Sequence, residues 1–284
     1  TRTGQLAGRI IAALSGRGEQ VFKGMESFAG AAVRADDPRL GATYDNFAGN
    51  LAAIRDAAAR AGAKAIVCTI ASNLRDCPPF ISSRRTQLSD ADRARFDELC
   101  AAGRAKASAG DYQAAMEQFS QAATIDPDSA NLEYWMGQCH LASGQASQAR
   151  EHLIRSRDLD ALRVRADTKI NDVLRQAGKR YDGFVDFEKI LAADGLSREG
   201  LPGAELLLDH VHFTFAGNCR LAAAVMPEVQ RLLAGTLGPT SAPDASRQAP
   251  TSGAATPAGG LNEKHLAQVL AMTGWDRYRI AEIL

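Results

Sequence analysis

The sequence predicts an α/β fold in which a parallel sheet is interrupted by an inserted array of helical hairpins. An apolar run without alternation at residues 65–70 is typical of a buried parallel strand, and a helical pattern precedes it. Small residues then recur with a fixed period in the middle of the chain, which indicates a helical repeat. Two short apolar runs after the repeats predict further strands. Together these observations place the repeats between strands of one sheet.

The N-terminal part, residues 1–91, is assigned to the first half of the α/β domain. Its expected helix ends where Gly62 provides a C-terminal cap, and the strand Ala65–Ile70 follows. The apolar positions of this helix have the spacing of a single face: Phe47, Leu51, Ile54, Ala58 and Ala61. A helix that leads directly into a buried strand is the unit from which parallel sheets are built.

Residues 92–162 are predicted to form two helical repeats, that is, four antiparallel helices in two hairpins. Four residues of the first copy recur 34 positions later: Gly103, Gly110, Ala115 and Phe119 correspond to Gly137, Gly144, Ala149 and Leu153. The pattern resembles the tetratricopeptide repeat, which has this period. We expect the small residues where helices cross closely. The second copy departs from the pattern at His140 and Ala161, so a coincidental period is the alternative.

Residues 163–234 are assigned to the second half of the α/β domain. Gly183–Phe187 and Leu206–Asp209 are expected to be strands parallel to the first one, and a closing helix follows them. Ligands of parallel sheets bind at the carboxyl ends of the strands. Asn73 and Asp209 both fall at such ends, so the sequence places the candidate site there.

A carboxylate stands three residues before an imidazole in Asp209-His210-Val211-His212. Asp209 can accept a hydrogen bond from one ring nitrogen of His212, which leaves the other nitrogen free to take a proton from a hydroxyl nucleophile. Asp209 and His212 are therefore the candidate catalytic residues, and a structural loop is the alternative. His210 is expected to matter far less, and with no third ligand near it we predict neither a metal site nor a cofactor.

The segment around this pair resembles a known family. Asp209-x-x-His212, followed by Gly217 and a terminal helix, is similar to the last block of the SGNH (GDSL-type) hydrolases, in which an Asp and a His serve a Ser nucleophile. The resemblance implies a three-layer, flavodoxin-like parallel sheet and Ser-His-Asp chemistry. Only Asp209 and His212 can be carried over from the catalytic residues of that family.

A second segment, from Tyr44 to Phe80, resembles a bacterial subgroup of the same hydrolases in which tetratricopeptide repeats interrupt the domain. It contains the run Ser72-Asn73-Leu74-Arg75-Asp76-Cys77-Pro78-Pro79-Phe80. In that family the nucleophilic Ser, the oxyanion-hole Gly and an Asn all precede the corresponding segment. The first 40 residues contain no Gly-Asp-Ser and no Gly-x-Asn-Asp. We therefore expect a fragment of a longer protein that lacks N-terminal and C-terminal parts.

Other polar residues near the expected strand ends have two interpretations each. Asn73 and Arg75 can contact a substrate from the rim of the site, or they can belong to a turn closed by Asn and Asp side chains. Ser72 is an alternative nucleophile, although no Gly-x-Ser-x-Gly elbow surrounds it. Arg163 and Arg165, where the chain leaves the repeats, can steer an anionic substrate or form salt bridges.

Composition narrows the range of partners. The 33 basic residues balance 33 acidic ones, so no net charge favours nucleic acid. No apolar run is long enough for a membrane helix and no signal peptide opens the chain. The compartment is left open, since the resemblance implies an N-terminal membrane anchor in some longer proteins. Residues 235–260 have the composition of a flexible linker, and residues 261–284 that of an amphipathic helical segment.

Two functions are consistent with these patterns. The first is an SGNH-like esterase or acyltransferase that acts on an ester such as an acylated glycan or lipid, with repeats that bind a peptide or protein. The alternative is a binding protein in which the repeats hold a partner and the hydrolase-like domain is a scaffold without turnover. A serine block upstream of the repeats would favour the enzyme.

Overall fold

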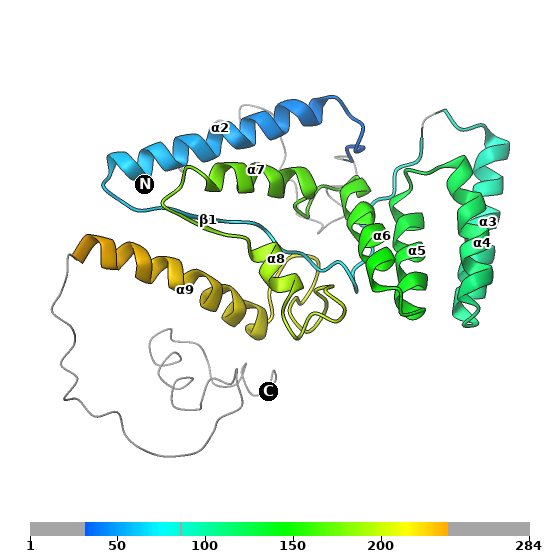
Figure 1. The fold of residues 1–284 in the computed structure, drawn as a ribbon. Helices are drawn as coiled ribbons and strands as arrows, with labels where there is room; N and C mark the ends of the chain where they lie inside the picture. The colour runs from blue at the N-terminus through cyan, green and yellow to red at the C-terminus, as the bar shows by residue number, and fades with distance from the viewer. Residues whose placement is uncertain (1–31, 86, 238–284) are drawn as a thin grey trace, which may run out of the picture. The chain divides into compact units, whose positions relative to one another are not determined.

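The computed structural model describes residues 32–85 and 87–237, and Figure 1 shows the order of the elements. The first labelled helix, α2 (Arg39–Arg60), coincides with the helical pattern predicted ahead of Gly62. Gly62 has a left-handed φ of +69°, a conformation that ends a helix and that glycine adopts without strain. The strand β1 (Ile66–Cys68) follows, so the predicted order of helix, cap and strand is confirmed.

The strand β1 pairs in parallel with β2 (Gly183–Val185), and the register aligns Ile66 with Gly183 and Cys68 with Val185. This confirms that segments before and after the repeats share one sheet. The sheet has two strands among the described residues, and most of the remaining ordered elements there are helices. The wider three-layer sheet that the resemblance implied is not shown in this part of the chain.

Two helices, α7 (Thr168–Gly178) and α9 (Phe215–Leu237), pack directly on the strand pair, and α2 packs on α7. Helix α7 contacts both strands, whereas α9 contacts β2 and the short α8 (Phe187–Ala192). Figure 1 draws α2 and α7 above the strands and α9 below them. The apolar core between these elements is made of buried side chains that follow the strands: Ala71, Val185, Phe187, Leu191, Leu206 and Leu207.

The segment Leu206–Asp209 is not a strand, and the prediction of a third parallel strand there was wrong. Leu206 and Leu207 are both fully buried, which a parallel strand covered on both faces would also show, so the hydrogen bonds decide between strand and turn. The amides of both leucines donate to the carbonyl of Gly203, which makes a turn. An isolated antiparallel bridge then joins Leu207 to Phe213. The apolar run thus supplies core contacts from a loop that folds back on itself.

The two predicted helical hairpins are confirmed. Helices α3 (Asp90–Ser108) and α4 (Tyr112–Ile125) form the first hairpin, and α5 (Ala130–Ala142) and α6 (Ala146–Leu159) form the second. Gly110 and Gly144 occupy the tight turns with φ of +81° and +73°, where a side chain would be strained. Figure 1 draws these four helices on the right, α3 and α4 in blue-green and α5 and α6 in green.

Close crossings within each hairpin explain the small residues of the repeat. A Cβ atom at Gly103 would collide with the ring of Phe119, and one at Gly137 would come within 2.7 Å of Leu153. Ala115 and Phe119 are fully buried, as is Ala149 in the second copy. The 34-residue period therefore reflects one packing arrangement used twice: a large side chain on the second helix fills the space left by a glycine on the first.

Some predictions concern residues outside this region. Residues 238–260 of the expected linker and the expected amphipathic segment 261–284 lie outside the described residues, while residues 235–237 belong to α9. Within the described part of the chain, no helix is both long and apolar enough to span a membrane. The described residues all belong to a single compact unit that ends at Leu237.

Gly103→Ala and Gly49→Ala are expected to change stability in opposite directions. A methyl group at Gly49, inside α2, would meet no atom within 4 Å. That exchange should stabilise the protein by roughly 0.5–1 kcal/mol, because alanine loses less backbone entropy in a helix. At Gly103 the methyl group would overlap Phe119, so a loss of roughly 1–3 kcal/mol is expected. Urea denaturation of both variants measures this, and a stabilised Gly103→Ala would contradict the crossing.

Candidate functional site

The predicted dyad forms within one short turn. Oδ2 of Asp209 lies 2.8 Å from Nδ1 of His212. Oδ1 of Asp209 accepts the backbone N–H groups of Val211 at 2.9 Å and of His212 at 2.8 Å. Because a carboxylate can only accept, Nδ1 carries the proton and Nε2 of His212 has a free lone pair. This is the orientation that a general base requires, although its pairing with a nucleophile stays a prediction.

The dyad lies at the surface. The His212 side chain is 75% exposed and that of Asp209 is 50% exposed. Partial burial raises the pKa of Asp209, but the N–H groups of His212 and Val211 and the imidazole outweigh it and lower the pKa to about 2. Asp209 is therefore ionised at neutral pH and keeps the proton of His212 on Nδ1.

The alternative nucleophile, Ser72, is not connected to this dyad. Ser72 is only 3% exposed, and its Oγ has no hydrogen-bond partner among the described residues. A serine that acts with a histidine base needs a hydrogen bond to it. Ser72 has none to His212 in this geometry.

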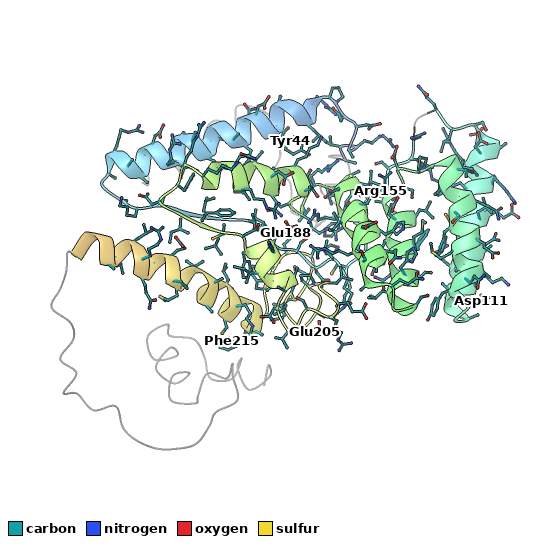
Figure 2. All side chains as sticks on the ribbon, in the orientation of Figure 1. Tyr44, Asp111, Arg155, Glu188, Glu205 and Phe215 are labelled. Atoms are coloured by element: carbon teal, nitrogen blue, oxygen red, sulfur yellow. The ribbon has the colours of Figure 1, made fainter. Side chains whose placement is uncertain are left out.

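The two candidate substrate-binding residues, Asn73 and Arg75, are both buried. Oδ1 of Asn73 accepts the amide of Asp76 at 2.9 Å, which closes the turn that the sequence offered as the alternative. Arg75 binds both carboxylate oxygens of Asp76 at 2.9 Å and also pairs with Glu205, which Figure 2 labels. Nη1 of Arg75 is buried without a hydrogen-bond partner among the described residues, and a role of Asn73 or Arg75 in substrate binding stays a prediction.

Asn73 and Arg75 belong to residues 73–81, which we call the connecting segment, and two helices of the repeats hold its backbone. Tyr134 and Gln138 of α5 both donate to the carbonyl of Arg75, at 3.2 and 2.6 Å. Asp160, at the end of α6, accepts the amides of Phe80 at 2.9 Å and Ile81 at 3.0 Å. The repeats are thus attached to the part of the chain that follows β1.

Arg165 completes this attachment. Its Nη1 donates to the carbonyls of Asn73 and Cys77, both at 3.2 Å, and its Nη2 lies 3.2 Å from Asp160. Arg165 is 5% exposed and Asp160 is 2% exposed, so burial lowers the pKa of Arg165 while the carboxylate opposes that change. Arg165 is therefore enclosed by the protein and not placed to steer a substrate from the surface.

His210 faces the connecting segment and not the dyad. Its Nε2 lies 2.8 Å from the carbonyl of Pro78 and donates to it, and its ring stacks on Phe80 with centroids 3.8 Å apart. Its own carbonyl accepts the amide of Asn73 at 3.0 Å. Burial lowers the pKa of His210, and the Pro78 carbonyl opposes that change. Because Nε2 of His210 is bonded to the carbonyl of Pro78, it is not available to bind a metal ion together with His212.

The carboxyl ends of β1 and β2, where parallel sheets place ligands, hold a group of ion pairs. Asp186, directly after β2, accepts hydrogen bonds from Thr69 at 2.9 Å and from Arg175 at 3.0 Å. Glu188, labelled in Figure 2, accepts from Arg175 at 2.7 Å and from the buried Arg157 of α6 at 2.8 Å. Sequence reasoning missed these pairs, because the partners come from separate elements. They link the strand ends to the repeats.

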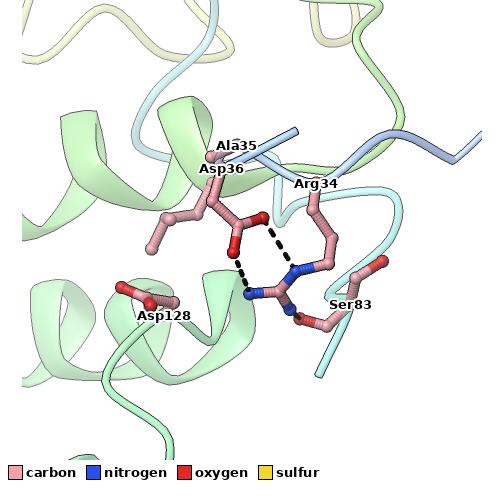
Figure 3. A pocket seen from close by; sticks show the side chains of 6 residues that line it. Arg34, Ala35, Asp36, Ser83 and Asp128 are labelled. Atoms are coloured by element: carbon pink, nitrogen blue, oxygen red, sulfur yellow. Dashed lines mark hydrogen bonds and ion pairs between the residues drawn. The ribbon is translucent and has the colours of Figure 1, made fainter. Parts of the chain in front are cut away.

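Three surface cavities lie away from the dyad. The smallest, of about 180 Å³, is lined by Arg34, Asp36, Ser83 and Asp128, and Figure 3 shows Arg34 bound to Asp36 and to Ser83. A second, of about 450 Å³, includes Arg163 and carries balanced charges from three basic and three acidic residues. These residues are Glu151, Arg155, Asp158, Arg163, Asp167 and Lys169. The third, of about 470 Å³, lies between α2 and α7.

Within residues 32–85 and 87–237, no group of three or more His, Cys, Asp or Glu side chains is arranged to hold a metal ion. The histidines of the second repeat have structural contacts: His140 stacks on His152 at 5.1 Å, and His152 binds Glu133 at 2.7 Å.

Comparison with known proteins supports a helical repeat module in the middle of the chain. The tetratricopeptide repeat family model matches residues 106–166. This range covers the end of α3 through α6 and confirms the repeat resemblance, but it does not reach the dyad. No match was found among curated proteins or among solved structures.

The pKa of Asp209 provides a test of the dyad in solution. It should titrate near pH 2, and His212→Ala should move it up toward 3.8 because the imidazole contact is lost. Since the folded-state pKa is depressed, the stability that Asp209 contributes is present above pH 3.8 and is lost as pH falls through 2. Carbon-detected NMR titration of the carboxyl group measures both values. An unperturbed wild-type pKa would contradict the turn.

Proposed function

We propose that the chain belongs to an SGNH-like ester hydrolase or acyltransferase in which Asp209 and His212 are the base half of a Ser-His-Asp triad. The observation that carries this proposal is the exposed dyad, in which Nδ1 of His212 lies 2.8 Å from Asp209 and Nε2 is left to accept a proton. The contact from Nδ1 to Oδ2 sets the tautomer of the imidazole, and two backbone N–H groups hold the carboxylate that orients it.

The proposed reaction begins with removal of a proton from a serine hydroxyl by Nε2 of His212. The serine oxygen attacks the ester carbonyl, and the protonated imidazole then gives the proton to the leaving alcohol. Asp209 stabilises the imidazolium. Within the described residues neither the serine nor the oxyanion donors can be assigned, so the proposal places them elsewhere in the complete protein. An exposed base suits a bulky substrate such as an acylated glycan or lipid.

The repeats have a binding role in this proposal. Stacked helical hairpins present extended surfaces that hold peptides or proteins, and the family match covers this module. Because α5 and α6 also hold the connecting segment, the partner-binding module and the dyad are mechanically joined. The substrate or its carrier protein would then be presented by the repeats.

The second candidate function is a scaffold without turnover, in which the repeats bind a partner and the dyad is structural. One observation favours it: the hydroxyl of Ser72 is buried and makes no hydrogen bond to His212. The two functions differ in whether His212 is required for hydrolysis.

Activity on a short-chain aryl ester should depend on both dyad residues. In the product of the complete gene, His212→Ala should lower kcat/KM by roughly 10⁴-fold, and Asp209→Asn should act similarly because it favours the wrong imidazole tautomer. The 284-residue chain should not hydrolyse the ester, since no nucleophile block is found in it.

His140→Ala is the matched control, since His140 is stacked on His152 in the second repeat. On the short-chain aryl ester, whose binding this proposal does not assign to the repeats, His140→Ala should leave kcat/KM unchanged. Hydrolysis by the 284-residue chain that is lost in Ser72→Ala would show that Ser72 is the nucleophile. If His212→Ala leaves kcat/KM of the complete protein unchanged, the proposed catalytic dyad is wrong and the scaffold function is favoured.

A further inference from the structure

The turn that carries the dyad has few contacts of its own. Apart from the bonds within Asp209–His212, the amide of Leu208 donates to the carbonyl of His212 at 2.7 Å, and the bridge from Leu207 to Phe213 closes the loop. Leu208 is 75% exposed and so gives the turn little packing. An exposed turn of this kind would move relative to the body of the protein unless another contact held it.

His210 provides such a contact with three groups at once. Its backbone carbonyl accepts the amide of Asn73, its Nε2 donates to the carbonyl of Pro78, and its ring lies on Phe80. The two rings are inclined by 23° with centroids 3.8 Å apart, which is a stacked arrangement. The middle of the turn is therefore fixed on the connecting segment through both its main chain and its side chain.

The connecting segment is a firm support for His210. Asp160 binds the amides of Phe80 and Ile81, and Arg165 binds the carbonyls of Asn73 and Cys77. These two side chains are buried and paired with each other. The residues that touch His210 are therefore held by groups whose own positions are fixed by burial.

We propose that His210 is a positioning residue for His212, which docks the dyad turn on the connecting segment and so fixes the direction of Nε2. The inference rests on the proposed function, and it differs from the expectation that His210 matters little. Reacting groups must be held to within a fraction of an ångström, and misplacement by about 1 Å costs roughly 10²-fold in rate. His210 would act on kcat without touching the substrate.

Three substitutions separate the contacts of His210. His210→Ala removes the ring and its N–H, His210→Phe keeps an aromatic ring against Phe80, and His210→Gln keeps an N–H for the carbonyl of Pro78. His140→Ala is again the control. In the complete protein we expect kcat on the aryl ester to fall roughly 10- to 100-fold in His210→Ala with KM unchanged, and to be partly restored in the other two variants.

A second measurement does not depend on activity. NMR titration of the 284-residue chain should show the pKa of Asp209 rising from about 2 toward 3.8 in His210→Ala, because the N–H groups that hold the carboxylate are no longer fixed. The melting temperature of His210→Ala shows whether the fold as a whole is destabilised. The His140→Ala variant shows whether loss of any histidine ring shifts the pKa of Asp209. If His210→Ala does not fold, His210→Phe and His210→Gln test the positioning role instead. Each should raise the pKa of Asp209 by less than His212→Ala does.

The outcomes separate the two proposals. An unchanged Asp209 pKa in a folded His210→Ala variant, or an unchanged kcat, would overturn the positioning role. If instead His210→Ala shifts the pKa while His212→Ala leaves ester hydrolysis intact, the turn is positioned as inferred and the enzymatic function is wrong.

Discussion

The buried pair of Asp160 and Arg165 is the interaction on which the rest of the arrangement depends. Removing both groups from water is costly, and the cost is offset because each also binds backbone groups of the connecting segment. Loss of one partner would leave an uncompensated buried charge, which typically costs about 3–5 kcal/mol. Since Asp160 ends the last repeat helix and the segment supports His210, one ion pair connects the repeats to the dyad.

The parts of the fold that sequence reasoning predicted correctly are those in which the signal is local or periodic. Gly103 and Phe119 mark a helix crossing because the same pair of sizes returns as Gly137 and Leu153. The dyad is equally local, since Asp209 and His212 are three residues apart and one turn brings them together. The parallel strand at 66–68 was evident from an apolar run that follows a capped helix.

The parts that sequence reasoning missed depend on partners far away in the chain. Leu206 and Leu207 read as a strand because an apolar run does not reveal that it lies in a buried turn. Arg165 reads as a surface cation because its acceptors, in the connecting segment, are 88 to 92 residues away. Whether a polar side chain can be buried depends on such distant hydrogen-bond partners. The periodicity of apolar residues in the sequence does not predict which partners these are.

The parallel pairing of β1 with β2 has a consequence for how the protein is made. Groups that meet at this sheet, such as Thr69 and Asp186, are 117 residues apart, and the intervening repeats consist mainly of local contacts. During synthesis the helices of each hairpin can pack on one another before β2 leaves the ribosome, although Arg157 of α6 must wait for Glu188, whereas β1 still lacks its partner strand. Contacts between residues far apart in sequence form slowly, so the apolar segment of β1 stays unpaired until β2 is available. We therefore expect the repeats to fold first, which would shorten the flexible loop that must close when β1 meets β2.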